Sequence, residues 1–76
     1  MVKMEVKNIQ DLRVLIAEKG MNIKSLSDRT GISQSYLSLI VNGKRTPSPV
    51  TAKKISEELK KEVNEIFFIN VDNKSI

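Results

Sequence analysis

Apolar residues recur along most of this chain at spacings of three and four, the period of amphipathic helices. The pattern predicts helices over residues 9–19, 23–30 and 34–42, and a fourth from residue 49 to about residue 59. A residue whose side chain readily caps a helix precedes each of them: Asn8, Asn22, Ser33 and Ser48. A glycine ends each of the first three, and Pro49 stands at the first position of the fourth. We therefore expect an all-helical core with tight turns.

The two ends of the chain show a different period. Residues 2–7 alternate between apolar and charged side chains, and residues 68–72 alternate again, as short strands do. A lone two-stranded ribbon is marginally stable in water. Our hypothesis is that residues 68–76 pair with residues 2–7, either in the same chain or across a dimer; the alternative for residues 2–7 is a frayed terminus.

Residues 22–47 contain two short helices joined by a turn at Gly31, which is the arrangement of a helix-turn-helix. The second helix has two sides. Its apolar side carries Tyr36, Leu37 and Ile40, and its other side carries Gln34, Ser35, Ser38, Leu39 and Asn42. Apart from Leu39, the second set is short, neutral and rich in hydrogen-bonding groups. Such a side suits a helix that approaches base edges in the major groove of DNA.

Over residues 9–67 the sequence resembles the lambda-repressor-like, Cro/CI (XRE) helix-turn-helix family. The resemblance rests on Leu26, Ser27, Gly31, Ile32, Leu37 and Ile40, on the run Ser35-Tyr36-Leu37-Ser38, on the NGKRTPSP segment from Asn42, and on a C-terminal EIFF. It implies an all-α, compact domain of four to five helices, to which short terminal strands can be added. We therefore expect a single domain over residues 1–76. Its core would span residues 8–67, and residues 1–7 and 68–76 would be terminal strands or tails. The apolar spacing of Ile55, Leu59 and Val63 allows one continuous last helix, whereas the resemblance favours a break near Lys60 and a short fifth helix.

The resemblance also implies which residues contact DNA. Base contacts are expected from Gln34, Ser35, Ser38 and Leu39. Phosphate contacts are expected from Asn22, Lys24, Tyr36, Asn42, Lys44 and Arg45. Each has an ordinary alternative: Gln34 as a solvated first-turn residue, Leu39 as a partly exposed aliphatic, Ser38 as a donor to its own helix, and Lys44 and Arg45 as surface charge.

Five positions depart from the family pattern. Lys60 and Lys61 stand where the family often has glycine and valine, respectively. Ile23 stands where the family commonly has a glutamine that contacts phosphate, so that contact is expected to be absent. Ile16 and Val41 stand where an arginine and a glutamate often pair. Replacement of a buried ion pair by two aliphatic side chains can be neutral or stabilising. The paired change fits the alignment, but it makes the expected DNA contacts sparser.

Composition narrows the possible functions. The 76 residues include no cysteine and no histidine, which argues against a disulfide framework, a metal site and most enzyme chemistry. No apolar run is long enough to span a bilayer and no signal-peptide core is visible, so we expect a cytoplasmic protein without cofactor or small-molecule ligand. The net charge of +4 permits nucleic-acid binding without demonstrating it. Between Gly20 and Thr51, however, four basic residues stand against one acidic residue.

The leading hypothesis is a sequence-specific regulator of transcription that binds double-stranded DNA. We expect a bacterial or phage repressor that binds a pseudo-palindromic operator as a homodimer. Two alternatives remain open at this point: an antitoxin of a toxin–antitoxin pair, and a protein-interaction module that has the same fold but has lost DNA binding. An enzyme is not expected.

Overall fold

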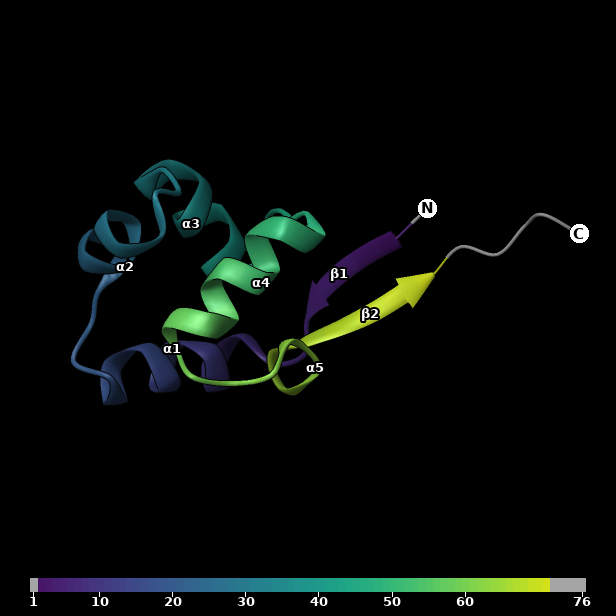
Figure 1. The fold of residues 1–76 in the computed structure, drawn as a ribbon, viewed down its shortest axis with the longest axis horizontal. Coiled ribbons are helices and arrows are strands. Elements are labelled where there is room, and N and C mark those ends of the chain that lie inside the picture. The colour runs from purple at the N-terminus through teal and green to yellow at the C-terminus, as the bar shows by residue number, and fades with distance from the viewer. Residues whose placement is uncertain (1, 72–76) are drawn as a thin grey trace, which may run out of the picture.

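The computed structural model describes residues 2–71 and contains five helices and two strands (Figure 1). In chain order they are β1 (Val2–Val6), α1 (Ile9–Glu18), α2 (Ile23–Thr30), α3 (Gln34–Val41), α4 (Pro49–Glu58), α5 (Val63–Ile66) and β2 (Phe67–Val71). The expected helical fold with short terminal strands is confirmed, and so is the break after the fourth helix. No helix within residues 2–71 is long and apolar enough to cross a membrane.

Side-chain caps fix the start of the first four helices at the expected residues. The side-chain oxygen of Asn8 accepts a hydrogen bond from the Asp11 amide at 3.0 Å. Ser33 and Ser48 cap α3 and α4 in the same way. Asn22 and Ser25 form a reciprocal capping box at the start of α2. These bonds satisfy amide groups that the first turn of a helix leaves without a partner.

Three helices end in the same hydrogen-bonded turn, in which a residue with positive φ follows the cap. At the end of α1, Gly20 donates to Ala17 and Met21 donates to Ile16, which is the Schellman pattern. Gly43 occupies the same position after α3. After α4, however, the position belongs to Lys60, whose φ is 58°. Lys60 is the one residue other than glycine with positive φ among residues 2–71.

The helices enclose a single apolar core, with α4 in the middle of them (Figure 1). Leu26, Leu37, Ile40, Leu59 and Phe67 are completely buried. The expected inward residues of α4, which are Ala52, Ile55 and Leu59, all lie in this core. Tyr36 is partly buried and packs against it. Because α2, α3 and α4 share the core, the two helices of the helix-turn-helix are held in fixed positions.

β1 and β2 form an antiparallel ribbon within the same chain, as one form of the pairing hypothesis predicted. Val2 lies opposite Val71, Met4 opposite Ile69, and Val6 opposite Phe67. Residues 72–76, which the hypothesis included, lie outside the described residues. Near the helices the apolar face of the ribbon is buried, because Met4 and Phe67 join the core. On the same face Val2, Ile69 and Val71 are exposed, although Ile69 lies opposite the buried Met4. The ribbon projects away from α2 and α3 (Figure 1).

Candidate nucleic-acid interface

The turn between α2 and α3 is held by two side chains of α2. The hydroxyl of Ser27 donates to the Ile32 carbonyl at 2.5 Å, and the Thr30 hydroxyl oxygen accepts the Ile32 amide at 3.2 Å. Both backbone groups of Ile32 are therefore satisfied, while its side chain is buried. A buried polar group without a partner would cost about 1–3 kcal/mol. These bonds fix the direction in which α3 leaves the turn.

The outward side of α3 is not covered by any other part of residues 2–71. Gln34 and Ser35 are exposed, and the Leu39 side chain is 39% exposed. Ser38 is half-buried on the same helix. Leu37 and Ile40, on the opposite side, are completely buried. The structure thus brings the four expected base-contacting side chains onto one accessible helix, with its reverse packed on the core.

A hollow of about 330 Å³ borders α3 on the side of Tyr36 and Arg45. Ser33, Ser35 and Leu39 complete its lining. The Arg45 guanidinium lies over the Tyr36 ring, 5.3 Å from the ring centroid, which is the distance range of a cation–π contact. This contact places the charge of Arg45 beside the outward side of α3.

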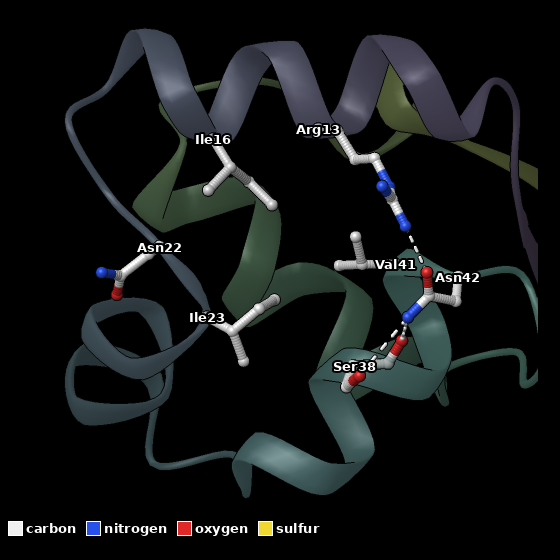
Figure 2. Close-up of a pocket in the computed structure, with 7 residues that line it drawn as sticks. All are labelled: Arg13, Ile16, Asn22, Ile23, Ser38, Val41 and Asn42. Carbon is white, nitrogen blue, oxygen red and sulfur yellow. Dashed lines mark hydrogen bonds between the residues drawn. The ribbon is translucent and has the colours of Figure 1, made fainter.

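A second hollow, of about 350 Å³, borders α3 on the side that faces α1 and the start of α2 (Figure 2). Its lining includes three of the residues that depart from the family pattern, which are Ile16, Ile23 and Val41. Ile16 and Val41 are buried. Polar side chains of Arg13, Asn22, Ser38 and Asn42 complete the lining. The hollow is therefore apolar at its base and polar around its edge.

Arg13 was not among the residues expected from the sequence, and the structure places it at this edge. Its guanidinium donates a hydrogen bond to the side-chain oxygen of Asn42 (Figure 2). The Asn42 amide nitrogen in turn donates to the Ser38 carbonyl at 2.8 Å. The sequence contained one signal: Arg13 precedes Ile16 by three residues, so both lie on the same side of α1.

The remaining expected phosphate contacts differ in their surroundings. The Asn22 side-chain oxygen is used in the α2 cap, which leaves its amide nitrogen as a possible donor. Lys24 lies 3.6 Å from the Asp28 carboxylate in an exposed pair. Such a pair on a helix surface contributes only about 0.3–0.5 kcal/mol, so Lys24 can leave it for another anion. Lys44 and Arg45 are exposed, and neither pairs with a carboxylate among residues 2–71.

The sequence and the fold of this chain are similar to those of known helix-turn-helix proteins. The helix-turn-helix family model HTH_3 matches residues 9–66. The HTH-type transcriptional repressor RghR of Bacillus subtilis (strain 168) is 40% identical over 52 residues, which are 67% of this chain and 38% of RghR. This chain therefore matches well under half of that relative's length.

A solved structure agrees in fold. The crystal structure of the restriction-modification controller protein C.AhdI from Aeromonas hydrophila superposes with a TM-score of 0.69 and 32% sequence identity. The match covers 75% of this chain and 86% of C.AhdI. Together with the capped α2 and α3, the turn at Gly31 and the match over residues 9–66, these similarities establish that the chain belongs to the lambda-repressor-like, Cro/CI (XRE) type of the helix-turn-helix family.

Proposed function

We propose that this protein is a sequence-specific regulator of transcription that binds double-stranded DNA, and that it acts as a repressor of bacterial or phage type. The observation that carries the proposal is the outward side of α3. Apart from Leu39, it presents short, uncharged, hydrogen-bonding side chains that are exposed or half-buried, and an arginine lies near each flank. An α-helix fits the major groove of B-form DNA, where each base pair presents a distinct set of donors and acceptors. The names of RghR and C.AhdI, a repressor and a controller protein, agree with this role.

Base recognition falls to the exposed residues of α3. Gln34, in its first turn, can form two hydrogen bonds with the N6 and N7 atoms of adenine. Ser35 can donate or accept, and Leu39 can make apolar contact with a thymine methyl group. Ser38 has its carbonyl engaged by Asn42, and its hydroxyl is 3.4 Å from the same amide nitrogen. Its hydroxyl can still take one further partner at the groove.

Phosphate contacts orient the protein and supply most of its affinity. Lys44 and Arg45 follow α3 after only two intervening residues, so both can reach the wall of the groove that α3 enters. Asn22, Lys24, Tyr36 and Asn42 are the other residues expected in this role. If about four phosphates per subunit are neutralised, the logarithm of the binding constant falls against the logarithm of salt concentration with a slope of about −3 to −4 per subunit.

The proposed operator is a pseudo-palindrome bound by a homodimer, with recognition helices about 34 Å apart. The exposed apolar face of the ribbon supports a dimer. Val2, Ile69 and Val71 share one face by the strand register and are 44%, 52% and 61% exposed. That face continues the buried core through Met4 and Phe67. We propose that it packs against the same face of a second copy, which would remove these side chains from water.

Neighbouring residues of β2 provide a matched test of the dimer. Ile69→Lys places a charge on the apolar face, whereas Asn70→Lys places the same charge on the opposite face. Size-exclusion chromatography with light scattering should give a monomer mass for Ile69→Lys and a dimer mass for both Asn70→Lys and the unaltered protein. A monomeric unaltered protein would refute the dimer, and a dimeric Ile69→Lys variant would move the interface away from this face.

The regulator proposal itself is tested first with random duplex DNA. Fluorescence anisotropy at low salt should show binding, because phosphate contacts do not depend on sequence. Selection from a random pool should then recover duplexes with related half-sites. Absence of binding to random duplex would refute the proposal and favour a protein-interaction role. Binding without any enriched sequence would refute base recognition by α3.

A further inference from the structure

The three arginines of the chain have different partners in the structure. Arg29 pairs with the Glu58 carboxylate at 3.6 Å, which links the ends of α2 and α4. Arg45 lies over the Tyr36 ring. Arg13 is hydrogen-bonded to the neutral amide of Asn42, and no carboxylate pairs with it within residues 2–71. Asn42 therefore orients the Arg13 guanidinium but does not neutralise its positive charge.

Asn42 fixes this direction because its own orientation is set by α3. Its amide nitrogen donates to the Ser38 carbonyl, four residues earlier, so its oxygen is turned toward α1 (Figure 2). A guanidinium group has five N–H donors in a planar fork. One bond to Asn42 leaves four donors, which is enough for a two-bond contact with a phosphate group.

Arg13 and Arg45 lie on opposite flanks of α3. At 100° per residue, Ser38 lies toward one flank of the outward side of α3, and Leu39 lies toward the other, next to the half-buried Tyr36. The hollow with Arg13 is lined by Ser38 and Asn42, and the hollow with Arg45 is lined by Leu39 and Tyr36. A helix in the major groove has a sugar–phosphate backbone on each side. An arginine near each flank therefore matches the two walls of the groove.

We propose that Arg13 binds a DNA phosphate on the flank of α3 opposite Arg45, and that Asn42 is a positioning residue that aims Arg13. This inference rests on the proposed DNA-binding function. It also changes the role expected for Asn42, whose amide donates to Ser38 and not outward. An amide partner carries no charge, so it orients the guanidinium without weakening the attraction of the guanidinium to phosphate. A carboxylate partner would weaken that attraction.

The test compares Arg13→Gln with Lys19→Gln in anisotropy titrations of the full chain on random duplex DNA between 50 and 200 mM salt. Lys19 is on the end of α1 and lines a hollow with Glu57 and Glu58, so it is a control that loses the same charge elsewhere. Arg13→Gln should reduce the magnitude of the salt slope by about 1 per subunit. When salt rises from 50 to 200 mM, the loss of DNA affinity per subunit should therefore be about 3.5-fold smaller for this variant than for the unaltered protein. Lys19→Gln should leave the slope unchanged.

The role of Asn42 is tested by a double-mutant cycle on the same duplex. If Asn42 acts through Arg13, Asn42→Ala should weaken binding in the unaltered protein and should add no further loss to Arg13→Gln. Arg13→Lys should keep the salt slope, because it keeps the charge, while it loses the two-bond geometry. Each variant is checked for folding by circular dichroism.

The outcomes separate this inference from the function on which it rests. If the unaltered protein fails to bind duplex DNA, the proposed function is refuted. If it binds, but Arg13→Gln and Lys19→Gln have equal salt slopes, the phosphate contact of Arg13 alone is refuted. If the losses from Asn42→Ala and Arg13→Gln simply add, Asn42 makes its own contact and the positioning role is wrong.

Discussion

Replacement of Lys60 by glycine should stabilise the protein. Lys60 has a φ of 58° in the turn after α4, where α1 and α3 have Gly20 and Gly43. A side chain in this left-handed conformation costs roughly 1–2 kcal/mol, because its Cβ approaches the following carbonyl oxygen. The Lys60 side chain is exposed and forms no ion pair among residues 2–71, so its loss removes little packing.

The expected gain is smaller than the strain, because glycine also gives the unfolded chain more freedom. That entropic effect costs about 0.4–1 kcal/mol. The midpoints of the two ranges predict an increase of about 0.8 kcal/mol in the free energy of unfolding. For a domain of this size, such a change raises the melting temperature by about 3–6 °C.

Thermal and urea unfolding, followed by far-UV circular dichroism at one fixed protein concentration, measures the effect. A fixed concentration is needed because dimerisation makes the melting temperature depend on it. Lys61→Gly is the matched control: it removes the same side chain from the adjacent exposed position, which does not have positive φ. It should destabilise by about 0.4–1 kcal/mol. Equal stabilities for the two variants would refute the strain at Lys60.

Three further substitutions test the site and the turn that presents it. Gln34→Ala should lose about 1–3 kcal/mol of discrimination at one base position of each half-site, measured by competition between single-base operator variants. Lys44→Ala should weaken binding to all DNA sequences alike and reduce the magnitude of the salt slope. If Lys44→Ala and Gln34→Ala have the same effects, the division between base-reading and phosphate-binding residues is wrong. Ser27→Ala should lower the free energy of unfolding by about 1–3 kcal/mol in urea titrations, because the half-buried Ile32 carbonyl loses its donor, and an unchanged stability would show that the carbonyl finds another partner.

Much of the fold could be predicted because the signals at the helix ends are local. Asn8, Asn22, Ser33 and Ser48 cap the helices as their sequence positions suggested, since a cap depends on backbone groups two or three residues away. The break at Lys60 was different. Apolar spacing alone allowed a continuous helix, and only the resemblance to a family that often has glycine there favoured the break. The left-handed Lys60 shows why: a strained residue gives no local signal of its own.

The accessible side of α3, on which the candidate site lies, could be predicted because it depends on one helix, whereas a feature that depends on two helices was missed. Helical periodicity identified the outward side of α3, because Gln34, Ser35 and Leu39 belong to a single element. The contact between Arg13 and Asn42 joins residues 29 positions apart, and it depends on how α1 crosses α3. No pattern within either helix specifies that crossing. The sequence did identify Ile16 and Val41 as a paired change, which marked the same junction.

The ribbon also determines where other polypeptide could be joined to this domain. Val2 is paired with Val71, so both outer ends of the ribbon are neighbours, on the side away from α2 and α3 (Figure 1). Adjacent ends of this kind favour insertion of a domain into a larger protein and tolerate circular permutation. A fluorophore or linker attached at the outer end of either strand would therefore start from one common location and leave α3 unobstructed.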